Sequence, residues 1–331
     1  MRLLLTDYAA STHRQRLHDL SDHVDVVRLS ELAGAGSAQI DAAFFSPDCY
    51  PELAANFMVA VLDAPRLSWL HTFSTGTDHP IFATLIDRGV RVTNSSGGSA
   101  VPISHAVAMH LLALSRRLPE TIDNQRRRQW SRLGGRDLQD STTVVLGFGP
   151  IGQAVARLMP AFGSRVIALR RNVGGTEPCE TWPLTRLHEA LAMADQLVIA
   201  LPATPETIGI LDRDAFDRLP DHALIVNVGR GELIDEAALV AASLNGRISG
   251  AALDVFNTEP LPIDSPLWDL PNVIVTPHIA ARTPATDAAA VDFFFTNLAH
   301  LVGGEPMIND IQRPVRPIGA SPLPCDSHRP E

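Results

Sequence analysis

Three polar side chains with acid, base and anion-binding chemistry each follow a segment that is typical of a β-strand. They are Arg230, Glu259 and His278. A guanidinium can bind a carboxylate through two hydrogen bonds. A histidine titrates near neutral pH and can protonate a carbonyl oxygen, while a neighbouring carboxylate would orient its ring and favour the imidazolium form. Because parallel sheets place active sites at the carboxyl ends of their strands, the three residues predict one site for a substrate that carries a carboxylate and a carbonyl.

Each of these residues has a structural alternative when it is taken alone. Arg230 could be a surface arginine in an ordinary strand-to-helix turn, because Asp235-Glu236 next starts a helix. A lone histidine after a strand is more often structural than catalytic. The catalytic interpretation therefore depends on the occurrence of all three at successive strand ends of one sheet.

The stretch Gly147-Phe148-Gly149-Pro150-Ile151-Gly152 has the G-x-G-x-x-G pattern of a dinucleotide-binding turn. It lies between a strand that begins at Thr143 and a helix predicted from Ile151 to about Phe162. Gly147 would permit the tight turn, Gly149 would let the backbone approach a pyrophosphate, and Gly152 would allow close helix packing. Three glycines in a loop are weak evidence by themselves, but this context favours a cofactor site at a helix N-terminus.

Two arginines, Arg170 and Arg171, stand where an NAD site normally carries an acidic residue for the ribose 2′-hydroxyl. A carboxylate would repel a 2′-phosphate, whereas each charge-assisted bond from an arginine contributes roughly 1.5 to 3 kcal/mol. The sequence therefore favours NADP over NAD, with NAD still possible. The alternative is that both arginines are solvated residues at the end of a strand.

The elements that would position these groups form two runs of alternating strands and helices, which is the rhythm of parallel α/β layers. An apolar helix from Pro102 to Arg117 separates the runs, another covers Val291 to Val302, and residues 311–331 form a proline-rich tail that we expect to be disordered. The first run has strands at Arg2–Thr6, Val24–Leu29, Ala42–Ser46, Leu67–Phe73 and Val90–Thr93. The second has strands from Thr143 and at Arg165–Leu169, Leu197–Leu201, Ala223–Val228, Ser249–Leu253 and Val273–Thr276.

Length and composition limit the function classes. A chain of 331 residues exceeds the size at which one core usually stops growing, so two domains are expected. The net charge of -10 argues against nucleic acid and anionic membranes as partners. Three cysteines without CxxC spacing suggest neither a disulfide framework nor a zinc site, and His13, His18 and His23 are spaced too widely around a helix for a metal site. We expect a cytoplasmic protein without a metal.

Several motifs in this order resemble the D-isomer-specific 2-hydroxyacid dehydrogenase family, which includes glyoxylate and hydroxypyruvate reductases. The resemblance extends to about Asn309. It rests on the glycine loop 147–152, Leu201-Pro202-Ala203-Thr204-Pro205-Glu206-Thr207, Asn227-Val228-Gly229-Arg230-Gly231, Gly250-Ala251-Ala252-Leu253-Asp254-Val255-Phe256, Glu259-Pro260 and Pro277-His278-Ile279-Ala280.

The resemblance implies two doubly wound parallel-sheet domains. A flavodoxin-like substrate domain would comprise residues 1–100 and 291–310, and a Rossmann dinucleotide-binding domain would comprise residues 101–290. It implies His278 as acid and base, Glu259 as its partner and Arg230 as the carboxylate ligand, and it assigns further carboxylate contacts to backbone N–H groups of Thr75 and Gly76. Cofactor contacts would come from Gly147, Gly149, Pro150, Ile151, Gly152, Arg170, Arg171, Leu201, Pro202, Thr207, Val228, Gly229, Asp254, His278 and Ala280.

The expected activity is reduction of a small 2-oxo acid to the D-2-hydroxy acid, and the reverse, by a homodimer. The same scaffold could instead act on formate, phosphite or a larger 2-oxo acid. A protein of another class, a catalytically silent dinucleotide sensor, is a further alternative, which the presence of Arg230, Glu259 and His278 disfavours.

Overall fold

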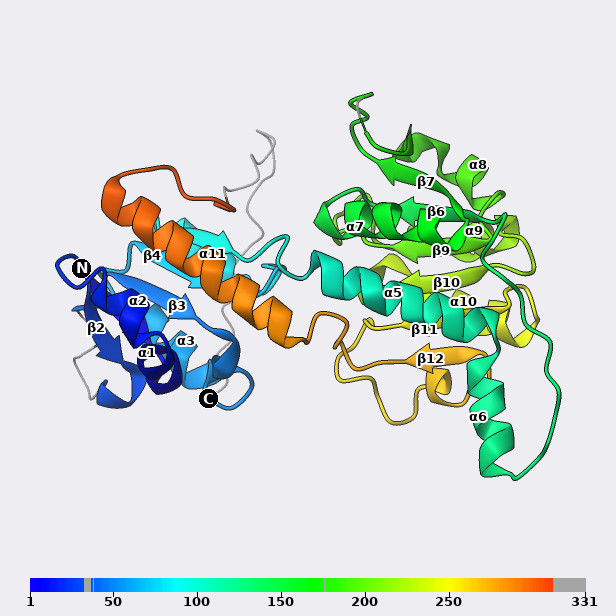
Figure 1. Cartoon of the computed structure of the whole chain (residues 1–331), viewed down its shortest axis with the longest axis horizontal. Helices are drawn as coiled ribbons and strands as arrows, with labels where there is room; N and C mark the ends of the chain where they lie inside the picture. The colour runs from blue at the N-terminus through cyan, green and yellow to red at the C-terminus, as the bar shows by residue number, and fades with distance from the viewer. Residues whose placement is uncertain (33–36, 38, 176, 312–331) are drawn as a thin grey trace, which may run out of the picture. The chain divides into compact units, whose positions relative to one another are not determined.

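The computed structural model describes residues 1–32, 37, 39–175 and 177–311. The chain divides into two compact units, one of Met1–Ser95 with Ala290–Glu331 and one of Ser96–Ala289. Each unit contains one parallel β-sheet covered by helices (Figure 1). The proline-rich tail expected at 311–331 lies, apart from Ile311, outside the described residues.

The sheet of the first unit has the strand order β2-β1-β3-β4-β5, and every pair is parallel. This is the flavodoxin-like order, so the predicted fold of this unit is confirmed. The strands are β1 (Arg2–Leu5), β2 (Asp25–Arg28), β3 (Ala42–Phe45), β4 (Trp69–Thr72) and β5 (Arg91–Asn94). The helices are α1 (Asp7–Thr12), α2 (Arg14–His18), α3 (Ala54–Leu62), α4 (Pro80–Asp87) and, from Ala290 on, α11 (Pro284–Gly303).

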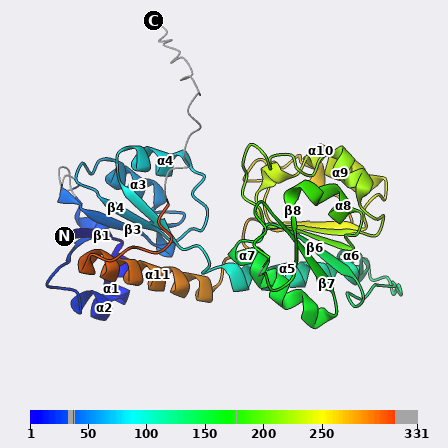
Figure 2. The ribbon, with the colours of Figure 1, turned by 90° about the horizontal axis from the view of Figure 1, so that it is seen from above.

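Neighbouring residues of these strands face opposite helical layers, because side chains alternate across a strand. Leu4 packs with Phe57 of α3 and Leu85 of α4, whereas Leu3 packs with Leu298 of α11 and Leu17 of α2. Helices α3 and α4 therefore cover one face of the sheet, and α1, α2 and α11 cover the other (Figure 2). Burial on both faces explains why the strands read as nearly continuous apolar runs.

A buried polar ladder crosses the carboxyl half of this sheet. His71 of β4 is fully buried; its Nδ1 lies 2.7 Å from Thr93 Oγ1 and its Nε2 lies 3.2 Å from Ser95 Oγ. Trp69 Nε1 donates to the same Thr93 hydroxyl at 2.9 Å. Phe294 of α11 stacks on Trp69, with ring centroids 5.7 Å apart, and tilts against His71. The apolar surroundings lower the pKa of His71 to about 3, so the ring is neutral in the folded protein.

The sheet of the second unit has the order β12-β11-β10-β9-β6-β7-β8, again with every pair parallel. The order reverses direction at β6, as in a Rossmann fold, so the predicted fold of this unit is also confirmed. The strands are β6 (Thr142–Leu146), β7 (Arg165–Arg170), β8 (Glu180–Pro183), β9 (Gln196–Ile199), β10 (Leu224–Asn227), β11 (Gly250–Leu253) and β12 (Val273–Val275).

Two helical layers also enclose this second sheet. Helix α5 packs through Leu111 with Val145 of β6 on one face, and α9 packs through Phe216 with Val144 on the other. In Figure 2, α5 and α7 lie on one side of the sheet and α8, α9 and α10 lie on the other. The helices are α5 (Ala100–Ser115), α6 (Leu118–Arg126), α7 (Pro150–Leu158), α8 (Leu187–Leu191), α9 (Arg213–Arg218) and α10 (Glu236–Leu244). Short 3₁₀ helices cover Leu29–Glu31, Pro47–Cys49, Met159–Phe162, Leu184–Arg186, Gly231–Leu233 and Pro266–Trp268.

Two elements of the second unit were absent from the sequence-based expectation. Strand β8 is a short edge strand that ends in a proline, so it carries little β-strand signal. Helix α6 follows shortly after α5, from which Arg116 and Arg117 separate it, with Arg117 in the left-handed region at φ 52°. Within the described part of the chain, no helix combines the length and the apolar character needed to cross a membrane.

We expect the first unit to lose stability as the pH falls from about 6.5 toward 3, because the unfolded chain binds a proton at His71 that the folded chain excludes. The slope due to His71 would approach about 1.4 kcal/mol per pH unit. Hydrogen exchange at β4 amides, followed between pH 7 and 4.5, measures the opening free energy. His71→Gln should flatten the slope, whereas exposed His18→Gln should not. An unchanged slope in His71→Gln would contradict the neutral, buried ring.

Candidate functional site

Two close backbone approaches build the glycine loop after β6. Gly147 has φ 101°, and a Cβ there would lie 2.5 Å from the carbonyl oxygen of Ala200. A Cβ on Gly152 would lie 2.0 Å from the carbonyl oxygen of Gly147. Any side chain at either position would therefore force the loop away from β9 or α7.

The middle glycine of the loop has a different environment. Gly149 is the N-cap of α7, and a Cβ there would have no neighbour within 4 Å. The space beside its backbone is open at a helix N-terminus, next to the position where the strand order reverses. Pro150 opens the helix and has no N–H itself, so the N–H groups from Ile151 on and the partial positive charge of the helix N-terminus suit a pyrophosphate. The loop fits a dinucleotide.

The loops after β9 and β10 pack against each other beside the glycine loop. Thr207 is buried, and its Oγ1 donates to the carbonyl of Pro202 at 2.7 Å, which closes the loop between them. A Cβ on Gly229 would lie 2.8 Å from the carbonyl oxygen of Leu201. These two loops therefore form one packed layer, which contains five of the residues that we expected at the cofactor: Leu201, Pro202, Thr207, buried Val228 and Gly229.

Arg230 sits on a turn that is fixed from both sides. The side chain of Asn227 donates to the carbonyl of Arg230 at 2.8 Å and accepts from the N–H of Gly229 at 3.0 Å. A Cβ on Gly231 would lie 1.9 Å from the carbonyl carbon of Phe256, so only glycine permits this approach. The turn that carries Arg230 is thereby held against the segment that leads to Glu259.

The His278 loop is anchored by a buried carboxylate at the end of β11. Asp254 is 3% exposed. Its Oδ1 accepts from Thr276 Oγ1 at 2.6 Å and from the N–H of Ile279 at 3.0 Å, and its Oδ2 accepts from the N–H of Ala280 at 2.9 Å. The backbone carbonyl of Asp254 also accepts from the N–H of His278 at 2.8 Å. Asp254 therefore fixes the backbone on both sides of the histidine.

His278 and Glu259 form a hydrogen-bonded pair. His278 Nδ1 lies 2.8 Å from Glu259 Oε2, while Glu259 Oε1 accepts from the N–H of Phe256 at 3.0 Å. The side chains are 52% and 36% exposed, so the pair lies at the surface of its unit. His278 has φ 53°, a left-handed conformation that costs energy in a non-glycine residue and that the Asp254 contacts maintain. Because Nδ1 faces the carboxylate, Nε2 is the ring nitrogen directed away from it and suited to exchange a proton.

The two arginines at the end of β7 both contact acids that the sequence alone did not indicate as their partners. Arg170 Nη1 lies 3.0 Å from Glu177 Oε1, and Arg171 Nη2 lies 3.8 Å from Glu206 Oε2. Glu177 follows Arg170 by seven residues, so its proximity in sequence was a signal that could have been used.

The loop expected to bind the substrate carboxylate belongs to the first unit. Its carbonyl groups are held by side chains: Asn94 Nδ2 donates to the carbonyl of Thr75 at 2.7 Å, and Ser74 Oγ donates to that of Gly76 at 2.9 Å. Ser74 in turn contacts Thr72 Oγ1, at the end of β4. The orientation of the peptide groups at Thr75 and Gly76 is thus fixed by bonds to their oxygens.

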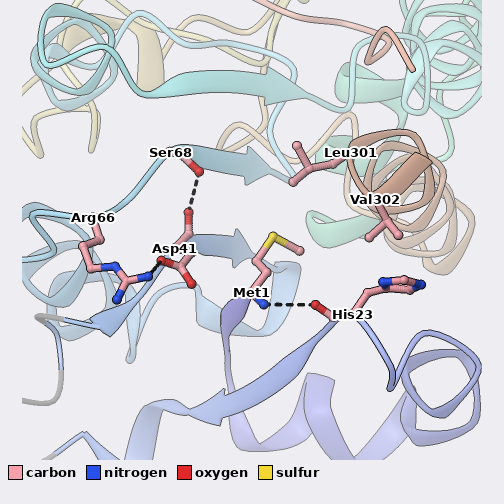
Figure 3. Close-up of a pocket in the computed structure, with 7 residues that line it drawn as sticks. All are labelled: Met1, His23, Asp41, Arg66, Ser68, Leu301 and Val302. Carbon is pink, nitrogen blue, oxygen red and sulfur yellow. Dashed lines mark hydrogen bonds and ion pairs between the residues drawn. The ribbon is translucent and has the colours of Figure 1, made fainter. Parts of the chain in front are cut away.

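A hollow of the first unit lies at the other end of the strands from the Thr75 loop (Figure 3). Four of its lining residues each precede a strand, so the hollow lies at the amino ends of the strands: Met1, His23, Asp41 and Ser68. Its polar groups bind one another: Arg66 Nη2 lies 2.9 Å from Asp41 Oδ1, and Ser68 Oγ donates to the carbonyl of Asp41. The full lining is Met1, His23, Asp41, Arg66, Ser68, Leu301 and Val302. Because parallel α/β sheets bind ligands at the carboxyl ends of their strands, this hollow is not our candidate site.

Comparison with known proteins gives matches over most of the chain. The sequence profile described as D-isomer specific 2-hydroxyacid dehydrogenase, NAD binding domain, matches residues 108–280. D-3-phosphoglycerate dehydrogenase of Mycobacterium tuberculosis is 38% identical over 234 residues, which are 69% of this chain and 44% of that protein. The chain thus spans about half the length of these curated relatives. Glyoxylate/hydroxypyruvate reductase B of Pectobacterium carotovorum is 36% identical over 254 residues, which are 73% of this chain and 78% of that protein.

Solved structures match at the level of the whole chain. One is a D-isomer specific 2-hydroxyacid dehydrogenase from Xanthobacter autotrophicus in complex with NADPH and MES. It has a TM-score of 0.73 and 29% sequence identity to this chain, and the match covers 94% of this chain and 97% of that one.

Proposed function

Because the chain belongs to the D-isomer specific 2-hydroxyacid dehydrogenase family, we propose that it uses NADPH to reduce a small 2-oxo acid of the glyoxylate and hydroxypyruvate type. The product would be the D-2-hydroxy acid, and the reverse oxidation would use the same groups. The observation that carries the proposal is the 2.8 Å contact between His278 Nδ1 and Glu259 Oε2, on loops that follow neighbouring strands of a dinucleotide-type sheet.

In the proposed reaction, Arg230 binds the substrate carboxylate and polarises the carbonyl, while His278 transfers the proton. The Nε2 proton of His278 passes to the carbonyl oxygen as the carbonyl carbon becomes tetrahedral, and the ring regains a proton from solvent. Glu259 orients the ring through its contact with Nδ1. A nicotinamide bound in this unit would supply the hydride. We assign a further carboxylate contact to the N–H groups of Thr75 and Gly76, whose carbonyls are held by other groups.

We assign cofactor binding to the second unit, which also carries Arg230 and His278, and the further carboxylate contact of Thr75 and Gly76 to the first. The pyrophosphate would lie at Gly147, Gly149, Pro150, Ile151 and Gly152, where the backbone is open at the start of α7. The nicotinamide half of the cofactor would lie beside the residues that follow β9, β10, β11 and β12, on the other side of the position where the strand order reverses. These residues are Leu201, Pro202, Thr207, Val228, Gly229, Asp254, His278 and Ala280. Arg170 and Arg171 would bind the 2′-phosphate of NADP.

Other substrates on this scaffold are distinguishable by assay. The comparison panel consists of formate, phosphite, larger 2-oxo acids and 3-phosphoglycerate, the last taken from the name of the mycobacterial relative.

The half-exposed Glu259–His278 pair favours a reaction with proton transfer over a silent dinucleotide sensor. The free thiols of Cys49 and Cys179, of which Cys49 is buried, support a reducing cytoplasm as the location.

We expect His278→Ala to lower turnover of glyoxylate or hydroxypyruvate by about 10²- to 10⁴-fold, the usual contribution of a positioned proton donor. NADPH binding, followed by its fluorescence, should be retained. His188→Ala, which removes an exposed histidine of the same unit, is the matched control and should turn over like the unaltered chain. Full activity in His278→Ala would remove this residue from the mechanism.

We expect initial rates at subsaturating cofactor to favour NADPH over NADH by about tenfold or more, because in the proposed site two guanidinium groups would bind the 2′-phosphate. The double variant Arg170→Gln, Arg171→Gln should raise the KM for NADPH and leave that for NADH nearly unchanged. A preference for NADH by tenfold in the unaltered chain would show that the two arginines have been misassigned.

We further propose a homodimer joined through the second unit. Exposed apolar side chains gather on α5 and α6: Val101, Met109, Leu112, Leu118 and Ile122 are between 37% and 55% exposed. Light scattering after size-exclusion chromatography should give twice the chain mass, and the double variant Met109→Glu, Leu112→Glu should give the mass of one chain. A monomer for the unaltered chain would exclude the dimer.

A further inference from the structure

The carboxylate of Glu177 occupies the hydrogen-bond donors that surround Arg170 at the end of β7. Its Oε1 lies 3.0 Å from Arg170 Nη1 and accepts from the backbone N–H of Gly174 at 2.7 Å. The side chain of Glu177 is only 7% exposed, whereas that of Arg170 is 37% exposed. A guanidinium, a backbone N–H and an enclosed anion therefore form one site in the loop between β7 and β8.

This site adjoins the glycine loop. The guanidinium carbon of Arg170 lies 5.9 Å from the centroid of the Phe148 ring, and Phe148 is the second residue of the loop 147–152. Gly147 also donates its N–H to the carbonyl of Leu169, the residue before Arg170. The anion site is thus at the end of β7 where the ribose of a bound dinucleotide lies in Rossmann folds.

The donors that hold Glu177 are those that a phosphate monoester also uses. Guanidinium groups and loop N–H groups bind phosphate oxygens as they bind carboxylate oxygens. The N–H of Gly174, followed by other loop N–H groups and Arg170, holds the pKa of Glu177 below its usual value, so the carboxylate is ionised at neutral pH. Two anions cannot share this guanidinium without mutual repulsion.

Resting on the proposed use of NADP, we propose that Glu177 is a built-in anion that competes with the 2′-phosphate for Arg170 and the Gly174 N–H. Binding of NADPH exchanges one anion for the other, whereas binding of NADH leaves Glu177 in place. Glu177 therefore limits the affinity for the phosphorylated cofactor and sets how strongly the chain prefers it.

Arg171 differs from Arg170 in a way that fits this exchange. Its Nη2 lies 3.8 Å from Glu206 Oε2, and the two side chains are 74% and 69% exposed. Such an exposed ion pair is weak and screened by solvent. Arg171 can therefore contact a 2′-phosphate with little rearrangement, while Arg170 must first release Glu177.

Isothermal titration of Glu177→Gln with NADPH, NADH, 2′,5′-ADP and 5′-AMP tests the proposal. The neutral amide should lower the Kd for NADPH and 2′,5′-ADP by about tenfold, corresponding to one charge-assisted bond freed from competition. The Kd for NADH and 5′-AMP should change by less than about twofold. Glu180→Gln is the matched control, since Glu180 pairs with Arg165 at 2.6 Å at the other end of β7, and it should change none of the four.

Unchanged or weaker binding of 2′,5′-ADP to Glu177→Gln, repeated in Glu177→Ala with an unaltered melting temperature, would overturn the proposal. Selective weakening of NADH binding would also overturn it, since Glu177 would then bind the ribose hydroxyls.

The variant Arg170→Gln separates this inference from the proposed use of NADP. If 2′,5′-ADP binds Arg170→Gln as tightly as it binds the unaltered chain, the proposed NADP site fails. If Arg170→Gln weakens binding but Glu177→Gln does not strengthen it, only the role of Glu177 fails.

Discussion

The buried carboxylate of Asp254 supports the geometry of the whole candidate site. A carboxylate that is 3% exposed must be compensated by hydrogen bonds, and its donors all lie in the loop that carries His278. The loop can therefore hold His278 in a left-handed conformation that an unsupported chain would avoid. The contact between His278 Nδ1 and Glu259 depends on this left-handed conformation, because the conformation directs the imidazole ring toward the loop that carries Glu259.

Close backbone contacts complete the same arrangement without side chains. Gly231 brings the Arg230 turn onto Phe256, three residues before Glu259, and Gly229 brings it onto Leu201. At the start of α7, Gly147 lets the backbone approach Ala200, and Gly152 lets the helix approach Gly147. Glycine at these positions removes the one atom that would separate the loops. The loops at the carboxyl ends of β6, β9, β10 and β11 therefore form one packed layer, on which a cofactor and a proton donor can be positioned together.

Charge compensation recurs at the candidate site. An acid lies beside each of two basic side chains of this site: Glu259 beside His278, and Glu177 beside Arg170. These acids act differently because their surroundings differ. Glu259 holds a partly exposed ring whose other nitrogen remains directed outward, whereas Glu177 is enclosed and takes the donors that a phosphate would need. In the function that we propose, Glu259 assists a proton transfer and Glu177 opposes the binding of an anion.

The sequence by itself determined the two parallel sheets and most of the candidate site. Strand composition and alternation are local properties, and the rule that parallel strands share a carboxyl edge brought Arg230, Glu259 and His278 into one prediction. The tertiary structure alone decided which side chains meet. Asp254 binds residues up to 26 positions away, and Asn94 fixes Thr75 across 19 positions, through loop conformations that no local pattern encodes. Strand β8 exists because β7 offers it an edge, although its own residues barely favour a strand.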